Sequence, residues 1–173
     1  MSGLSIRELH EAVGGRLSLA TLPPLSGSSE PIGRLVTRVE DVRPGDVFWD
    51  VAQVRATGAA NAEEAFSRGA QGVIASGPHA EPWAGRFSLE VADPCEAMHR
   101  FIAVVRQRFA GDVIAVAGHF GKSTTLHLIR TALEQGEPIG VSDGAAIPWD
   151  MRLAQLANAL TSTESLILVE IGE

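Results

Sequence analysis

The sequence predicts an α/β protein that is built from two domains with mainly parallel sheets. Along its 173 residues, short apolar segments typical of strands alternate with segments whose apolar residues recur at helical spacing. Hydrophobic residues make up 45% of the chain and charged residues 20%, which is ordinary for a globular protein and argues against disorder. Gly111 follows a long expected helix, so we place a small α/β domain over residues 1–110 and a second domain over residues 111–173.

Expected helices and strands alternate in the first domain. Ile6, Leu9 and Val13 recur at helical spacing, and the two glycines that follow end this helix. Asn61 is expected to cap a second helix, because Glu64 stands three residues further on. We expect helices over residues 5–13, 61–68 and 95–109, and strands over residues 32–39, 47–51, 72–75 and 87–91.

The second domain begins with an apolar strand over residues 113–117, which we expect to be buried. Residues 122–133 and 149–160 fit helices, and residues 139–142 fit either a short strand or a loop. The last strand, residues 166–171, reads Leu-Ile-Leu-Val-Glu-Ile, a buried pattern with one carboxylate set into it. Because this sheet is small, we expect an unpaired edge that the first domain, self-association or a partner chain covers.

Charge and composition narrow the classes of partner and compartment. The formal charge is −7 and no basic run occurs, which disfavours nucleic acid as a partner. No apolar run approaches the ~18 residues that span a membrane, and no N-terminal signal segment is recognisable. The one cysteine, Cys95, cannot form an internal disulfide, so we expect a cytoplasmic protein. A thiolate could be stabilised at the helix start near Cys95, but a small buried residue is the favoured interpretation.

The most informative stretch is Gly118-His-Phe-Gly-Lys-Ser123, which lies between an expected strand and an expected helix. Its glycines let backbone N–H groups approach an anion, and the helix N-terminus adds a partial positive charge. Lys122 can reach terminal phosphates, and the Ser123 hydroxyl can bind Mg²⁺. The stretch therefore predicts a site for a nucleoside triphosphate, and the alternative is a structural turn without a ligand.

Glu170 is the second candidate group. A carboxylate within an apolar strand is costly to bury unless it is paired or binds a metal. At the carboxyl end of a strand beside the phosphate loop, this carboxylate would face the nucleotide. We therefore expect Glu170 and Ser123 to contribute to a Mg²⁺ site, and the alternative for Glu170 is an exposed position at the strand end.

Together these segments resemble the Mur ligases, whose ATP loop reads Thr-Gly-x-x-Gly-Lys-Thr-Thr. Residues 168–172, Leu-Val-Glu-Ile-Gly, resemble the glutamate-bearing strand of this family, in the form found in the ligases that add D-alanyl-D-alanine. Residues 37–49 resemble a segment of the family's UDP-sugar-binding domain, and residues 65–74 match the helix and strand that follow it. The resemblance spans nearly the whole chain, in the order of the family.

The resemblance implies a UDP-sugar-binding-like domain followed by a truncated P-loop ATPase domain, with ATP and Mg²⁺ as cofactors. It implies amide formation on a UDP-muramoyl peptide, a peptidoglycan precursor, through an acyl phosphate. Lys122 would be the catalytic residue that neutralises charge on the transferred phosphoryl group. Ser123 and Glu170 would bind Mg²⁺, and Thr37 and Arg38 would contact the UDP-sugar. The residues that would bind ATP are Gly118, His119, Phe120, Gly121, Lys122, Ser123 and Thr124.

Several positions depart from the pattern of the family. Val36 replaces the aspartate of its Asp-Ser-Arg segment, and residues 56–61 lack the acid of its Asp-Gly-His or Asp-Gly-Asn segment. His119 and Phe120 are bulkier than the usual loop residues, and we expect Phe120 to be exposed.

Length leaves the function open between two hypotheses, because family members continue well past the glutamate strand. The chain is either part of a longer ligase or a short nucleotide-binding or scaffold relative that does not catalyse ligation. An unrelated P-loop ATPase or kinase is a weaker third hypothesis, which the Arg-Pro-Gly-Asp-Val-Phe segment at residues 43–48 disfavours.

Overall fold

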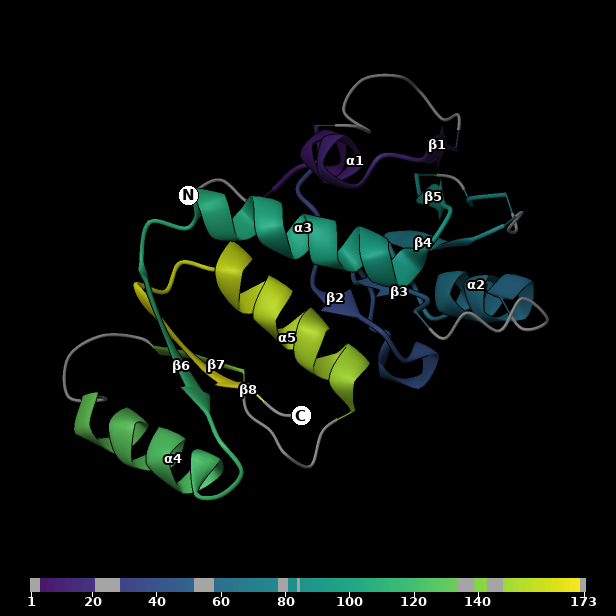
Figure 1. The fold of residues 1–173 in the computed structure, drawn as a ribbon. Coiled ribbons are helices and arrows are strands. Elements are labelled where there is room, and N and C mark those ends of the chain that lie inside the picture. Colours follow the sequence, from purple (N-terminus) through teal and green to yellow (C-terminus); the bar gives the residue numbers. More distant parts are fainter. Residues whose placement is uncertain are drawn as a thin grey trace. The chain divides into compact units, whose positions relative to one another are not determined.

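The computed structural model describes residues 4–20, 29–51, 58–77, 81–83, 85–133, 139–142 and 148–171. Helices and strands alternate in this part of the chain (Figure 1), so the predicted α/β fold class is confirmed. The chain divides into two compact units, Ser2–Phe101 and Ile102–Glu173, within helix α3 (Pro94–Arg108). The predicted domain boundary at residue 110 stays a prediction. The departure at 56–61 lies partly outside the described residues.

The first unit contains a five-stranded sheet with the order β1-β5-β4-β3-β2. Its strands are β1 (Arg16–Leu19), β2 (Leu35–Val36), β3 (Val47–Trp49), β4 (Gly72–Ser76) and β5 (Phe87–Val91). Strands β2 to β5 run parallel, so their carboxyl ends meet at one edge of the sheet. Strand β1 pairs antiparallel with β5 and is missing from the sequence-based prediction, because it is short and mostly exposed.

A capping side chain marks the start of α1, whereas α2 begins before the capping residue that the sequence predicts. The Ser5 side chain accepts from the backbone N–H of Glu8 and thereby caps α1 (Ile6–Val13). Helix α2 (Gly58–Ser67) begins earlier than predicted, so the expected cap at Asn61 is wrong. Two alanines precede Asn61 and favour helix, which extends α2 toward its N-terminal side.

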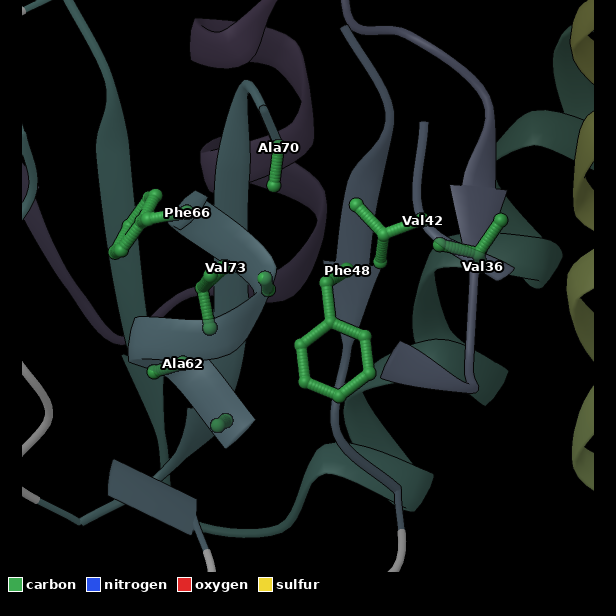
Figure 2. Close-up of a cluster of buried hydrophobic side chains, with 9 residues drawn as sticks. Val36, Val42, Phe48, Ala62, Phe66, Ala70 and Val73 are labelled. Atoms are coloured by element: carbon green, nitrogen blue, oxygen red, sulfur yellow. The ribbon is translucent and has the colours of Figure 1, made fainter. Parts of the chain in front are cut away.

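A cluster of buried apolar side chains lies between α2 and the sheet (Figure 2). The alanines that α2 and the turn after it contribute are small enough for both to approach β4 closely, and the Phe48 and Phe66 rings pack in the same cluster. The members of the cluster are Val36, Val42, Phe48, Ala62, Ala65, Phe66, Ala70, Val73 and Ala75.

Trp49 joins the sheet of the first unit to the start of α3. Its side chain is completely buried, and its indole Nε1 donates to the Pro94 carbonyl oxygen at 2.8 Å. The Trp49 ring centroid lies 5.8 Å from that of Phe101, at an interplanar angle of 51°. A buried indole N–H needs an acceptor, so this hydrogen bond determines where α3 begins relative to β3.

We predict that Trp49→Phe lowers the free energy of unfolding by about 2–4 kcal/mol, because the Pro94 carbonyl loses its donor and the smaller ring leaves a cavity. Urea unfolding followed by far-UV circular dichroism measures this loss. The matched control is Trp83→Phe, since the Trp83 side chain is 52% exposed and stacks on Phe66. The control should change the free energy by less than about 0.5 kcal/mol, and equal losses in the two variants would contradict the role of Trp49.

The second unit contains a three-stranded parallel sheet with the order β6-β8-β7. Its elements are β6 (Asp112–Ala117), α4 (Lys122–Leu133), β7 (Ile139–Ser142), α5 (Trp149–Thr161) and β8 (Leu166–Ile171). Helix α4 packs on β6 and β8, and α5 packs on β7 and β8. Residues 139–142, for which the sequence leaves strand and loop open, form a strand.

Strand β6 is not buried, which corrects the expectation from its apolar sequence. Each of its residues is either half-buried or exposed, and Ile114 is 37% exposed. The reason is its position: in the described part of the chain β6 pairs with β8 alone and forms an edge of the sheet. An apolar run of this kind is typical of a strand with neighbours on both sides. The predicted unpaired edge is therefore present among the described residues.

Among the described helices, none combines the length and the apolar character that crossing a bilayer requires.

Candidate functional site

The loop between β6 and α4 has a backbone suited to anion binding. Gly118 and Gly121 adopt positive φ angles of 140° and 75°. A Cβ at either position would meet no atom within 4 Å, so it is the backbone angle and not crowding that favours glycine. Helix α4 begins at Lys122, directly after Gly121. The N–H groups of its first turn and its partial positive charge favour an anion at this loop.

Lys122 places a cation across the loop. It is the only lysine in the sequence, and its Nζ donates to the Gly118 carbonyl oxygen at 2.5 Å. The ammonium group therefore lies between the first glycine of the loop and the start of α4. A phosphate oxygen is a stronger partner for this group than a carbonyl oxygen, because both partners would then be charged.

Ser123 and Glu170, which the sequence predicts to act together, are in contact. The Ser123 Oγ donates to the Glu170 Oε2 at 2.9 Å. Glu170 is only 4% exposed, so the alternative of an exposed glutamate at the strand end is wrong. Its other oxygen, Oε1, is buried and has no hydrogen-bond partner. A buried polar atom without a partner costs about 1–3 kcal/mol, which indicates that this oxygen is placed for a ligand.

The parallel pairing of β6 with β8 explains this contact across 47 residues of sequence. Val116 lies opposite Glu170, and Ala117 lies opposite Ile171. Both strands point toward the same edge, so Glu170 reaches this edge beside the strand that leads into the phosphate loop. The pairing of β6 with β8 thus positions the Glu170 carboxylate, and the first turn of α4 positions the Ser123 hydroxyl.

The Ser123 hydroxyl and the Glu170 carboxylate fit a Mg²⁺ ion whose other ligands are phosphate and water oxygens. Mg²⁺ prefers oxygen ligands, keeps several waters and binds through one or two protein groups together with substrate phosphates. The described residues contain no group of three or more His, Cys, Asp or Glu side chains that could hold a metal. An ion at this place would therefore depend on a bound nucleotide.

The remaining loop residues are exposed. His119, Phe120 and Thr124 all lie at the surface, and Phe120 is 96% exposed, as the sequence predicts. The assignment of these three side chains to ATP binding stays a prediction.

Thr37 and Arg38 follow β2 at the carboxyl edge of the first sheet. The Thr37 Oγ1 is buried without a hydrogen-bond partner. The Arg38 side chain is 51% exposed, and its Nε lies 3.2 Å from a carboxylate oxygen of Glu40. A hydroxyl and a guanidinium group at this edge suit a polar, anionic ligand, and their contact with a UDP-sugar stays a prediction.

Asp50 is a buried carboxylate that the sequence analysis misses. It follows β3 directly, is 7% exposed and accepts from the Asn61 amide at 3.5 Å. The signal that identifies Glu170, a carboxylate at the end of an apolar strand, also applies to the Val-Phe-Trp-Asp sequence at residues 47–50.

The Cys95 side chain is half-buried, not fully buried as expected, and its surroundings disfavour a thiolate. Burial and the nearby Asp93 carboxylate raise the pKa of the Cys95 thiol, although α3 begins here. The Asp93 Oδ1 accepts from the backbone N–H groups of Cys95 and Glu96, at 2.8 and 3.0 Å. The helix start is thus capped by a carboxylate, which disfavours a thiolate beside it.

We predict that Ser123→Ala lowers the free energy of unfolding by about 1–3 kcal/mol without nucleotide, because the buried Glu170 carboxylate loses the Ser123 donor. Urea unfolding followed by far-UV circular dichroism measures the change. The neighbouring variant Thr124→Ala removes an exposed hydroxyl and should stay within about 0.5 kcal/mol of the original protein. If both variants unfold at the same urea concentration, the contact of Ser123 with Glu170 contributes nothing.

A search of curated proteins finds sequence similarity to the UDP-N-acetylmuramoyl-L-alanyl-D-glutamate–2,6-diaminopimelate ligase of Rhizobium meliloti (strain 1021). The two sequences are 36% identical over 104 residues, which are 57% of this chain and 20% of that ligase. No protein-family model matches the chain.

Solved structures share the fold. The UDP-N-acetylmuramoylalanyl-D-glutamyl-2,6-diaminopimelate–D-alanyl-D-alanyl ligase of Acinetobacter baumannii matches 98% of this chain, with a TM-score of 0.75 and 23% identity. The MurF ligase of Thermotoga maritima, solved in complex with ADP, matches 80% of it, with a TM-score of 0.62 and 21% identity. This chain spans 36% and 32% of the lengths of these two proteins.

Proposed function

We propose, from its confirmed resemblance to the Mur ligases in sequence and fold, that this chain binds ATP and a UDP-muramoyl peptide as part of an ATP-dependent peptidoglycan-precursor ligase. The observation that carries the proposal is the contact of Ser123 with the buried Glu170, beside the loop that bears Lys122. The ADP complex of the Thermotoga maritima relative supports a nucleotide at such a fold. Because the chain spans 20% of the curated relative, the complete reaction is proposed for the whole protein.

In the proposed reaction, a carboxylate oxygen of the substrate attacks the γ-phosphorus of ATP, and ADP leaves. The amine of the incoming group then attacks the carbonyl carbon of the acyl phosphate, and phosphate leaves as the amide bond forms. The Lys122 ammonium would exchange the Gly118 carbonyl oxygen for oxygens of the γ-phosphate and stabilise their developing charge. Ser123 and Glu170 would hold Mg²⁺, which neutralises phosphate charge when bound.

The first unit would bind the UDP-muramoyl peptide at the carboxyl edge of its sheet. The buried Thr37 hydroxyl can donate to a ligand oxygen, and the half-exposed Arg38 guanidinium can pair with a diphosphate. These roles rest on the resemblance of residues 37–49 to the UDP-sugar-binding segment of the family.

We predict that Mg²⁺-ATP binds the protein in calorimetry and that Lys122→Ala weakens this binding at least about tenfold, the equivalent of one lost charge-assisted contact. Arg130→Ala removes the same charge from the far end of α4 and should leave the affinity nearly unchanged.

Amine labelling gives an independent measurement of the same contact, since Lys122 is the only lysine. Mg²⁺-ATP should slow the modification of Lys122 and leave that of the N-terminal amine unchanged. If the protein without substitutions neither binds Mg²⁺-ATP nor shows slower labelling of Lys122 in its presence, the phosphate loop is not active.

We predict that Glu170→Gln removes the dependence of ATP affinity on Mg²⁺. The original protein should bind ATP more tightly with Mg²⁺ than with a chelator, and the variant should show nearly the same affinity in both conditions. Asp112→Asn is the control, because this exposed carboxylate lies at the opposite end of β6 from the loop. A Mg²⁺ effect that persists in Glu170→Gln would exclude Glu170 from the metal site.

A nucleotide-binding or scaffold relative without ligase activity is the second candidate function. Phe120 favours it, because a bulky and 96% exposed ring stands in the phosphate loop. Phosphate release from ATP that requires both the UDP-muramoyl peptide and the amine would support the ligase. Tight ATP binding with no such release would support the second candidate.

A further inference from the structure

We propose that Glu40 lowers the affinity of the first unit for anionic ligands, because its carboxylate pairs with Arg38 and competes with an anion for the same guanidinium group. This inference rests on the proposed binding of a sugar nucleotide at Arg38. Thr37 and Arg38 would favour this binding, and Glu40 would oppose it.

The ion pair places Glu40 in direct competition with a ligand. The Arg38 Nε lies 3.2 Å from the Glu40 Oε1, and the two side chains are 51% and 57% exposed. Glu40 therefore occupies one edge of the guanidinium group that would bind a diphosphate, while water and ligand still have access to the pair. A guanidinium group binds phosphate best with two parallel N–H donors, so an anion that uses the edge containing Nε competes with Glu40 for it.

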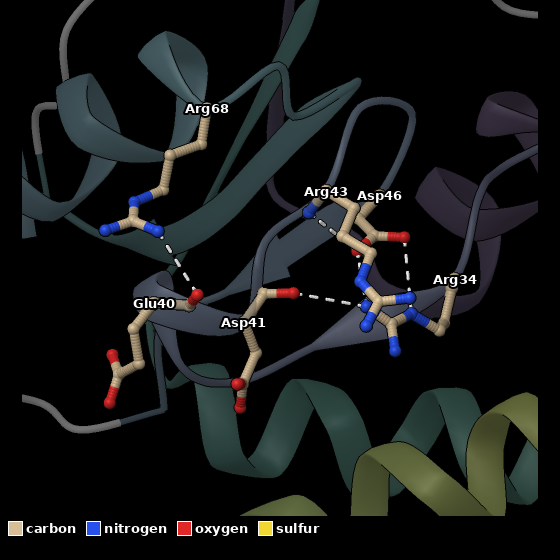
Figure 3. Close-up of polar contacts among 6 residues, drawn as sticks. All are labelled: Arg34, Glu40, Asp41, Arg43, Asp46 and Arg68. Carbon is tan, nitrogen blue, oxygen red and sulfur yellow. Dashed lines mark hydrogen bonds and ion pairs between the residues drawn. The ribbon is translucent and has the colours of Figure 1, made fainter.

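The backbone that carries Glu40 is held by two further guanidinium groups (Figure 3). Residue Glu40 lies in the 3-10 helix η1 (Val39–Asp41), and the Arg68 Nη1 donates to its carbonyl oxygen at 3.1 Å. The Arg34 Nη2 donates to the Asp41 carbonyl oxygen at 3.2 Å. Arg34 also forms an ion pair with the buried Asp46 carboxylate at 2.7 Å, so the C-terminal part of η1 is tied to the turn before β3.

Asp46 holds the Arg34 guanidinium group in place beside η1. Asp46 raises the pKa of Arg34, first by hydrogen bonding and then by its charge, so this guanidinium group stays charged. Asp46 also accepts from the backbone N–H of Arg43 at 3.0 Å, which closes the turn before β3. Because η1 is anchored, the backbone that carries the Glu40 side chain is held beside Arg38.

Exposure determines the size of the expected effect. An ion pair between half-exposed side chains is weak and is screened by salt, so a ligand with two negative charges can displace it. The removal of the Glu40 charge should then strengthen anion binding by about two- to fivefold, the range that exposed ion pairs support.

The test uses UDP as the probe and calorimetry on the full chain at low and high salt. Glu40→Gln should bind UDP about two- to fivefold more tightly than the original protein, and the difference should shrink at high salt. Glu90→Gln is the charge-matched control, since Glu90 pairs with Arg16 on another pair of strands, and it should not change the affinity. Arg38→Ala should weaken binding, and Glu40→Gln should bring no gain when Arg38 is absent.

The outcomes separate this inference from the proposed function. If Arg38→Ala weakens UDP binding while Glu40→Gln leaves it equal or weaker, Glu40 does not compete, and the sugar-nucleotide site stands. An equal gain in Glu90→Gln, or a gain that persists without Arg38, would also overturn the inference, because it would reflect net charge alone. If no variant binds UDP, both the site and the role of Glu40 are wrong, whereas the ATP site of the second unit is unaffected.

Discussion

The parallel pairing of β6 with β8 is the constraint on which the candidate site depends. It brings the Glu170 carboxylate to the edge where β6 leads into the phosphate loop. With the strands one residue out of register, Glu170 would point to the other face of the sheet, because successive side chains alternate between faces. The hydrogen bond from Ser123 then joins this carboxylate to the first turn of α4 and leaves its second oxygen buried without a hydrogen-bond partner.

The two units share one physical arrangement, which we propose serves different ligands. In each, parallel strands end at one edge, and side chains just beyond the strand ends remain available for binding. The second unit adds the N-terminus of α4 and the ammonium group of Lys122, which suit phosphates. The first unit offers the hydroxyl of Thr37 and the guanidinium group of Arg38. An ATP-dependent ligase needs such a pair of sites, one for the nucleotide and one for the activated substrate.

The sheet of the first unit is well packed, whereas the strand and loop that lead to the nucleotide site of the second unit are exposed. Trp49 and the cluster around Phe48 anchor the first sheet, and Arg34 with Asp46 holds the turn before β3. By contrast, the edge strand β6 exposes apolar residues, and the phosphate loop exposes the Phe120 ring. Among the groups proposed to bind ligands, the Thr37 hydroxyl and the Glu170 carboxylate are thus buried, whereas the Arg38 guanidinium group is half-exposed.

The sequence by itself determined most of the helices and strands, although not β1, together with the phosphate loop and the candidate role of Glu170. These depend on local signals: apolar periodicity, turn glycines and a carboxylate in an apolar strand. Only the tertiary structure decided that Glu170 is buried against Ser123, that β1 joins β5, that β6 lies at an edge and that Arg38 is paired with Glu40. Burial depends on which strands become neighbours, and strands distant in sequence pair through contacts that no local pattern records. The helix start at Gly58 was missed for a related reason, since the Asn61 signal is the same inside a helix as at its end.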